Sequence, residues 1–155
     1  MQQYGGFWIR VLAYVIDYFI VNVATSILVV VFAVGIAFAE PSDEAAGGAL
    51  VLVWGGTVVI DWLYHAIMES SSWQGTVGKK GLNLVVANAA GERISFGRAT
   101  GRYFAKFLSA LILLIGYFMV GWTQRKQGLH DLIVDTVVYK AREPNAITTS
   151  AKVFE

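Results

Sequence analysis

Titratable side chains recur inside and beside the long apolar segments of this chain, where a charge is costly unless it is paired or hydrated. A carboxylate in such a place can bind a cation or a proton, and a histidine titrates near neutral pH. The set is therefore consistent with an ion or proton pathway, or with interhelical pairs that fix packing, which is the commoner case. The residues concerned are Arg10, Asp17, Glu69, Arg98, Arg102, Lys106, His130 and Asp131.

Metal binding is the next chemistry that the spacing allows. Asp61, His65 and Glu69 recur every four residues, so a helix would carry them on one face. The chain has two histidines, on separate segments, and no cysteine, so a closed tetrahedral site would depend on carboxylates. We therefore expect no metal site and no cofactor. No serine has a base at a spacing typical of nucleophilic catalysis, so we expect no enzymatic activity.

The composition narrows the class of protein. Of the 155 residues, 56% are hydrophobic and 15% are charged, against roughly 25% charged in soluble domains. The apolar residues lie in long blocks, which indicates an integral membrane protein whose first partner is the lipid bilayer. The net charge of +1 provides no field that would gather nucleic acid, so no nucleic-acid partner is expected.

The first apolar segment, residues 7–39, contains no proline and predicts one long helix. It would be about 50 Å long, against about 30 Å for the hydrocarbon core of a bilayer. Helical side chains lean toward the N-terminus, so Arg10 and Asp17 are expected to find different partners. Asp17 would meet Arg98, Arg102 or Lys106 from the third segment, and Arg10 would meet Asp131 or Glu69.

Two further helices are expected, over residues 49–69 and 97–122. The third one begins with basic residues and then becomes wholly apolar. A full third span is favoured, but a break near Gly116 would instead make 98–122 a re-entrant hairpin. The sequence therefore predicts an all-α integral membrane protein with three transmembrane or re-entrant helices.

The polar stretch between the second and third helices predicts irregular backbone and a short surface element. Residues 82–86 and 94–96, separated by turn-forming residues, predict a small β-hairpin. Residues 75–80 resemble a phosphate loop but lack its spacing, so their lysines are assigned to anionic lipid headgroups. Residues 141–155 are expected to form a polar C-terminal tail, mobile from residue 145.

The loop charges predict the orientation. The loop after residue 39 carries Glu40, Asp43 and Glu44 and no basic residue, whereas residues 69–102 carry five basic residues and two acidic ones. By the positive-inside rule, the N-terminus and the 70–97 loop would face the cytoplasm. A full third span would then leave the basic C-terminal tail outside, which the same rule disfavours.

Five separated motifs give the chain a family resemblance. It resembles the RDD family of small bacterial membrane proteins over residues 4–140, with Arg10, Asp17 and Asp131 at the three positions that name the family. The motifs are Gly6-Phe7-Trp8-x-Arg10, then Asp17 within the first helix, Trp73-Gln74-Gly75-Thr76-x-Gly78-Lys79-Lys80, Gly91-x-Arg93-x-Ser95-Phe96-Gly97-Arg98-Ala99, and Gln127-x-Leu129-His130-Asp131.

The resemblance implies a helical domain in the bacterial inner membrane and a role in transport, without naming a substrate. We therefore expect a protein that moves an ion or small solute, for example by cation or proton exchange. Asp17 would bind the cation, and Arg10 and Asp131 would hold or gate that site. Because three helices enclose little volume, a homo-oligomer is expected. The alternative is a non-transporting accessory subunit of a larger membrane complex, with the same charges as interhelical pairs.

Overall fold

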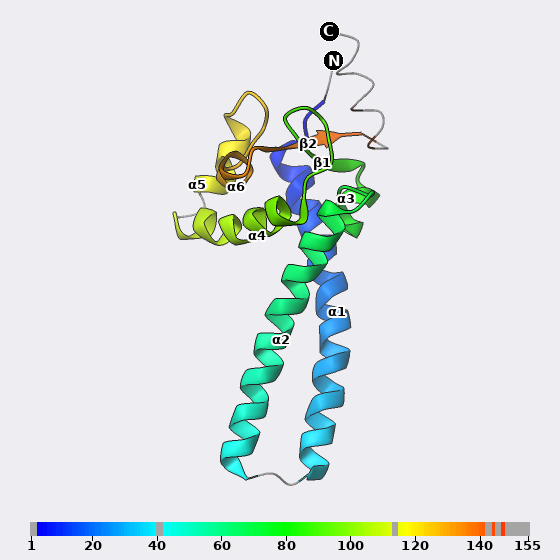
Figure 1. The fold of residues 1–155 in the computed structure, drawn as a ribbon, viewed down its shortest axis with the longest axis vertical. Coiled ribbons are helices and arrows are strands. Elements are labelled where there is room, and N and C mark those ends of the chain that lie inside the picture. The colour runs from blue at the N-terminus through cyan, green and yellow to red at the C-terminus, as the bar shows by residue number, and fades with distance from the viewer. Residues whose placement is uncertain (1–2, 40–41, 113–114, 142–143, 145–146, 148–155) are drawn as a thin grey trace.

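Two long antiparallel helices dominate the fold (Figure 1). The computed structural model describes residues 3–39, 42–112, 115–141, 144 and 147. Helix α1 (Phe7–Ala39) and helix α2 (Asp43–Ser70) are each long and apolar enough to cross a membrane. Helix α2 begins six residues before the predicted start at residue 49. The reason is a local cap, because the Ser42 hydroxyl accepts a hydrogen bond from the Ala45 amide at 3.4 Å.

The two long helices bury little of their surface against each other. In α1 the buried positions recur every four residues, at Ala13, Asp17, Val21 and Thr25. Most of the remaining surface of both helices exposes large apolar side chains, among them Phe19, Val23, Ile27, Val31, Phe38, Leu52, Trp54 and Val58. An apolar surface of this extent requires lipid or another protein to cover it.

A two-stranded sheet lies at the end of the hairpin that is remote from Asp43 (Figure 1). Strand β1 (Leu84–Asn88) pairs antiparallel with strand β2 (Thr136–Lys140), with Val86 opposite Val138. The predicted hairpin of residues 82–86 with 94–96 is therefore wrong. The Asn88 side chain accepts hydrogen bonds from the amides of Ala90 and Glu92, and the chain then enters a helix without returning along β1.

The third apolar segment is broken. It forms helix α4 (Phe96–Leu111), helix α5 (Ile115–Phe118) and a 3₁₀ turn, η1 (Met119–Gly121), and the two halves are bent by 116°. A single straight helix over 97–122 is therefore wrong; the segment is a broken span or a re-entrant loop. Helix α4 lies across the end of the hairpin (Figure 1).

Close packing at Gly116 accompanies this bend. A Cβ on Gly116 would lie 2.8 Å from the Cβ of Ser109 and 3.0 Å from that of Leu129. The glycine thus lets α5 fold back against α4 and the short helix α6 (Leu129–Ile133). The break expected near Gly116 in the re-entrant alternative thus lies between Leu111 and Ile115.

The N-terminal residues and β2 lie side by side at the sheet end. Tyr4 forms a bridge with Tyr139, and the Gly5 amide donates to the Val138 carbonyl at 2.8 Å. Within the predicted tail, Ile147 is buried against the sheet, whereas residues 142–143, 145–146 and 148–155 lie outside the described part of the chain. The described ends of the chain therefore meet at one end of the hairpin.

Candidate functional site: a buried charge network and its cavity

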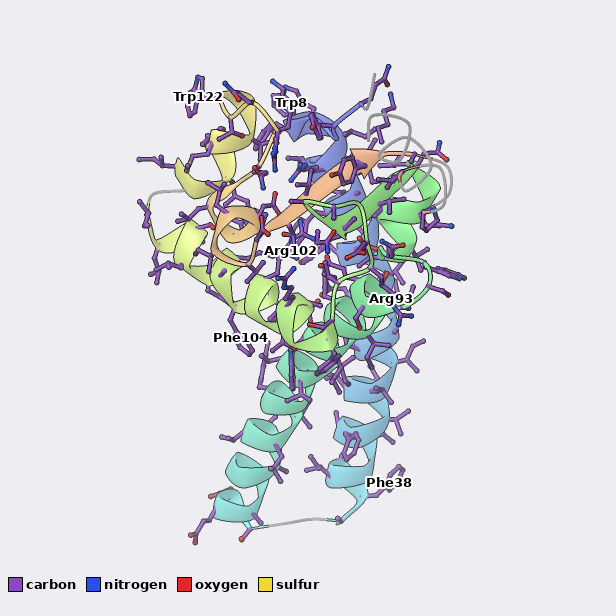
Figure 2. The ribbon with its side chains drawn as sticks, turned by 45° about the horizontal axis from the view of Figure 1, so that its top comes forward. Trp8, Phe38, Arg93, Arg102, Phe104 and Trp122 are labelled. Carbon is purple, nitrogen blue, oxygen red and sulfur yellow. The ribbon has the colours of Figure 1, made fainter. Side chains whose placement is uncertain are left out.

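Five charged side chains of alternating sign form one network of ion pairs at the sheet end. Each comes from a different helix, so the pairs join five elements. Figure 2 shows Arg102 in the middle of this end, surrounded by side chains of the neighbouring elements. In order along the network, the residues are Arg10 of α1, Asp131 of α6, Arg102 of α4, Glu69 of α2 and Lys79 of α3 (Val77–Gly81).

Asp131 accepts hydrogen bonds on both carboxylate oxygens. Oδ1 accepts from Nε and Nη2 of Arg102 at 2.9 and 2.6 Å, and Oδ2 accepts from Nη1 of Arg10 at 2.6 Å and from the Gly128 amide at 3.1 Å. Burial alone would raise the pKa of Asp131, but the guanidinium groups of Arg102 and Arg10 outweigh it and hold the pKa well below its ordinary value. Asp131 is therefore a permanent anion at the start of α6.

Glu69 joins the second half of the network. Its Oε2 accepts from Nη1 of Arg102 at 2.9 Å, and its Oε1 accepts from the ammonium of Lys79. Burial lowers the pKa of Lys79 to about 8, although the charge of Glu69 opposes the shift. Lys79 was assigned to lipid headgroups from the sequence; that assignment is wrong, because the side chain is buried and paired.

The central members of the network are buried and hydrogen-bonded. Asp131 and Glu69 are at most 1% exposed and Arg102 is 2% exposed. Within the described residues, every buried side-chain nitrogen and oxygen has a hydrogen-bond partner. Arg10 uses its remaining groups on the backbone, donating to the carbonyls of Gly5 at 2.8 Å and Lys126 at 2.5 Å. Such pairing offsets the desolvation of buried charges.

Asp17 belongs to a separate cluster of neutral donors. It accepts from the Tyr64 hydroxyl at 2.8 Å, the Thr76 hydroxyl at 2.5 Å and the Gly78 amide at 2.8 Å. The prediction of a partner among Arg98, Arg102 and Lys106 is therefore wrong. Of the two partners expected for Arg10, Asp131 and Glu69, the structure shows Asp131.

Gly78 makes the Asp17 cluster possible. A Cβ on Gly78 would lie 2.3 Å from the carbonyl oxygen of Ala13 and 3.0 Å from the carboxylate of Asp17. Only glycine lets α3 approach α1 closely enough for its amide to reach the carboxylate. The motif of residues 73–80 thus positions two anions, Asp17 through Thr76 and Gly78, and Glu69 through Lys79.

A cavity of about 370 Å³ lies beside the network, lined mainly by α1, α4 and the segments after α4. Its lining contains more cationic than anionic side chains. Asp17 is the single carboxylate of the lining in the described chain, and its oxygens are already engaged by three donors. The cations of the lining are Arg10, Lys79, Arg102 and Lys106.

Lys106 differs from the other three cations. Among the residues that the structure describes, no carboxylate oxygen lies within 4.0 Å of its ammonium nitrogen. The nearest aromatic contact is distant, with the nitrogen 6.0 Å from the centre of the Tyr103 ring. Lys106 is half-buried and lines the cavity, so its charge is directed at the cavity and its surroundings.

His130 and Arg98 complete the predicted set. His130 is buried, with Nδ1 3.4 Å from the Ser109 hydroxyl, and burial lowers its pKa to about 3 although Asp131 opposes the shift. It is therefore neutral at physiological pH. Arg98 is exposed at the start of α4 and does not line the cavity. Of the eight predicted residues, seven lie in the network, in the Asp17 cluster or along the cavity. Arg98 lies at the surface.

Residues that the sequence analysis missed are mostly uncharged donors. Tyr64 and Thr76 hold Asp17, and Tyr103 donates to Asp61 at 2.7 Å. Tyr64 lies beside the stripe of Asp61, His65 and Glu69, but nothing in its spacing indicates a bond to α1. In the described part of the chain, no three histidine or acidic side chains are placed to hold a metal ion.

Comparisons with known proteins agree with this arrangement of motifs. The sequence profile of the RDD family matches residues 4–135. The chain is 42% identical over 152 residues to Uncharacterized protein YxaI of Bacillus subtilis, covering 90% of this chain and 100% of that protein. It is 27% identical over 143 residues to Uncharacterized membrane protein YteJ of the same organism, covering 88% and 81%.

A third relative is matched over a shorter region. The chain is 31% identical over 84 residues to the Proline-rich antigen homolog of Mycobacterium tuberculosis, covering 54% of this chain and 34% of that protein. No solved structure matches the chain. The likeness to YteJ and the two long apolar helices indicate a membrane location. Because the family profile covers most of the chain, this protein belongs to the RDD family.

Proposed function

We propose that this RDD protein is a multi-pass protein of the bacterial inner membrane that binds a small anion in its cavity, as part of a transport role. One observation carries the proposal. The cavity lining holds four cations and one carboxylate, and the ammonium of Lys106 has no carboxylate within 4.0 Å in the described chain. A partly desolvated cation of this kind favours an anionic ligand.

The charge distribution supports placing the cavity at the cytoplasmic membrane surface. A span of about 20 residues counted back from Ala39 ends near Ile20, so Asp17 and Arg10 would lie at headgroup level. The far end of the hairpin carries Asp43 and Glu44. Basic residues gather at the sheet end, where the positive-inside rule would put the cytoplasm: Lys79, Lys80, Arg98, Arg102, Lys106, Lys126 and Lys140.

The amphipathic character of α4 supports the same placement. Its buried face includes Ala99, Arg102 and Ser109, and its exposed face carries Phe104, Phe107, Leu108 and Leu111. A helix of this kind can lie in the plane of the interface with its apolar face in the acyl region. The bend after α4 would then return the chain to the cytoplasmic side, in agreement with the basic residues that follow.

An anion fits the cavity better than the cation first expected at Asp17. Both oxygens of Asp17 are occupied by Tyr64, Thr76 and Gly78, so this carboxylate acts as an anchor for α3. The other two buried carboxylates, Glu69 and Asp131, are each bonded to two cationic side chains. Arg10, Lys79 and Arg102 are compensated by these carboxylates, so the positive charge that an entering cation would meet is chiefly that of Lys106.

The test is anion binding and flux with two matched variants. Purified protein is titrated with phosphate, sulfate, acetate and chloride, and with Na⁺, K⁺ and Mg²⁺ salts of one common anion. We expect binding that depends on the anion and falls by about tenfold in Lys106→Gln. Arg98→Gln removes the same charge from the same helix, outside the cavity, and should bind as the unchanged protein does. Dependence on the cation, or equal losses in the two variants, would overturn the proposal.

Flux in proteoliposomes tests the transport part separately. Transport predicts that the anion with the strongest binding crosses the bilayer and that Lys106→Gln slows it. Binding without flux would favour the second candidate, an accessory subunit of a larger membrane complex. The exposed apolar surfaces of α1 and α2 favour that candidate, because two helices enclose no pathway alone. Further copies of this chain or another membrane protein would have to cover them.

A further inference from the structure

We infer that the ligand of this cavity is an anionic lipid, whose headgroup lies against Lys106 and whose hydrocarbon tail leaves between α1 and α4. The inference rests on the proposed anion binding and names the class of anion. It follows from the way polar and apolar side chains divide the lining. One part of the lining is charged and the other consists of apolar and aromatic side chains, and the most exposed side chains of the lining are apolar or aromatic.

The charged part of the lining is the interior part. Arg102 is 2% exposed, Lys79 is 8% exposed and His130 is 5% exposed. Lys106 lies next to them on α4 and is half-buried. A phosphate or carboxylate would reach these groups only by entering the space between the helices. There it would gain from low local dielectric and from charge-assisted hydrogen bonds.

Part of the apolar lining reaches the surface, whereas Val120 and Val138 are buried. Val11 and Tyr14 of α1 are 36% and 57% exposed, and Ala110 of α4 is exposed as well. Val11 and Tyr14 lie between Arg10 and Asp17, at the headgroup level proposed above. The adjoining surface of α4 exposes Phe107 and Leu111, which would reach the acyl region. A free inorganic anion would leave this apolar mouth without a matching partner, whereas a lipid tail would cover it.

The size of the cavity also fits a headgroup with its tail outside. At about 370 Å³ it lies near the lower end of the roughly 300–1,000 Å³ typical of ligand pockets. It can hold a headgroup but not a diacyl lipid, so the acyl chains must lie along the helices. Basic pockets on the cytoplasmic side of membrane helices bind anionic headgroups by the same chemistry.

The positive charge of the lining should favour lipids with an anionic headgroup over zwitterionic ones. A phosphatidylcholine headgroup would bring a quaternary ammonium toward Lys106, Arg102 and Arg10, which is unfavourable by like-charge repulsion. Phosphatidylglycerol and phosphatidate carry no cation. Glu69, Asp131 and Asp61 are carboxylates near Lys106 that do not line the cavity. Glu69 and Asp131 are each paired with two cations, and Asp61 accepts a hydrogen bond from Tyr103. The cavity should therefore discriminate by headgroup charge at equal acyl chains.

The experiment measures lipid retention by native mass spectrometry of the purified protein. Three probes are added separately: dioleoyl phosphatidylglycerol, dioleoyl phosphatidylcholine, and glycerol 3-phosphate, which has the anionic group without a tail. We expect phosphatidylglycerol to be retained at least about tenfold better than either of the others. Lys106→Gln should lose the preference for phosphatidylglycerol over phosphatidylcholine, and Arg98→Gln should keep it.

A second variant tests the tail path. Ala110→Trp places a large side chain at the exposed mouth and leaves the charges unchanged, so it should weaken phosphatidylglycerol retention more than any binding of glycerol 3-phosphate. Circular dichroism and gel filtration of each variant establish that it is folded.

The outcomes separate this inference from the proposed function. If glycerol 3-phosphate binds as well as phosphatidylglycerol, and Lys106→Gln weakens both, the anion site stands and the lipid inference is wrong. If phosphatidylcholine is retained equally, or Lys106→Gln keeps the preference, the lipid inference is overturned. If no anion of either kind binds in a Lys106-dependent way, the proposed function fails as well.

Discussion

The two ends of the helical hairpin differ in how their side chains are buried. At the end near Asp43, α1 and α2 expose apolar side chains and touch each other little. At the sheet end, five helices and two strands surround a network of buried charges (Figures 1 and 2). The first end depends on its surroundings for burial. The second end buries its own core and pairs the five charges of its network, whereas Lys106 beside the network has no carboxylate within 4.0 Å in the described chain.

This difference indicates where the specificity of the fold lies. Apolar residues of a lipid-facing helix can be exchanged with small effect, because lipid adapts to their shape. A buried ion network has one arrangement in which every charge is paired, and loss of one member leaves others unpaired. Substitutions at the sheet end should therefore be costly, and matched substitutions along the hairpin should be nearly neutral.

Removing the central arginine should have the largest effect. Arg102→Met leaves Glu69 and Asp131 each with one cation fewer, so we expect a loss of about 3–5 kcal/mol in the free energy of unfolding. Arg98→Met, on the exposed side of the same helix, should change it by less than about 0.5 kcal/mol. Unfolding of both variants in mixed detergent micelles measures the difference. Similar losses would mean that the network does not stabilise the sheet end.

Acid should weaken the sheet end through His130. The unfolded histidine takes up a proton below about pH 6.5, whereas burial holds the pKa of the folded one at about 3. The unfolded state therefore binds more protons as the pH falls from 6.5 to 4.5, and stability should fall by at most about 2–3 kcal/mol. Asp131 stays ionised in this window, because its pKa is held lower.

The His130→Asn variant isolates this contribution. Its unfolding free energy should change less between pH 6.5 and 4.5 than that of the unchanged protein. An identical pH slope in the two proteins would show that His130 is accessible to protons in the folded state.

Adding a methyl group at Gly78 should disrupt the close packing of α3 against α1. Gly78→Ala places a Cβ 2.3 Å from the Ala13 carbonyl oxygen, so we expect a loss of about 2–3 kcal/mol from overpacking and from a weaker bond to Asp17. Gly55→Ala, within α2, meets nothing within 4 Å and should stabilise the helix by up to about 1 kcal/mol. Thermal unfolding compares the two. A destabilised Gly55→Ala would mean that the hairpin is packed against something further.

The smallest loss in the free energy of unfolding should come from removing the Tyr64 hydroxyl. Tyr64→Phe removes one of three donors to Asp17 and the acceptor of the Val77 amide, so we expect a loss of about 1–2 kcal/mol. Tyr18→Phe, on the exposed surface of α1, should be neutral. Denaturant titrations of the pair measure the difference, and equal stability of both variants would show that Asp17 is held without Tyr64.

The sequence was sufficient for the elements that depend on local pattern. Residues 7–39 form one helix because nothing in them breaks an apolar helical run. Arg10 and Asp17 have different partners, as the leaning of helical side chains predicts, and Arg10 pairs with Asp131, one of the two partners expected for it. The sequence also predicted the helix that begins after residue 95, because basic residues recur on one side of it. The predicted break near Gly116 lay in the alternative that was not favoured.

The misses concern contacts that no local pattern records. Strand β1 pairs with residues 136–140, about 50 residues later in the chain, so the apparent hairpin in residues 82–96 was a local substitute for a distant partner. Asp17 pairs with hydroxyl and amide donors, and a search for basic residues could not find these. Lys79 resembled a surface lysine, and only the burial of Glu69 beside it reveals its role.

The most direct test of a two-span hairpin with its charge-bearing end on one side is cysteine labelling across the membrane. The chain has no cysteine, so Glu44→Cys, Ser72→Cys and Gln124→Cys each introduce one exposed thiol. A membrane-impermeant reagent is applied to intact spheroplasts and to inverted vesicles. We expect residues 72 and 124 to react only in inverted vesicles and residue 44 only in spheroplasts. Reaction of residues 72 and 124 from opposite sides would mean that 96–121 spans the bilayer, and would contradict the account.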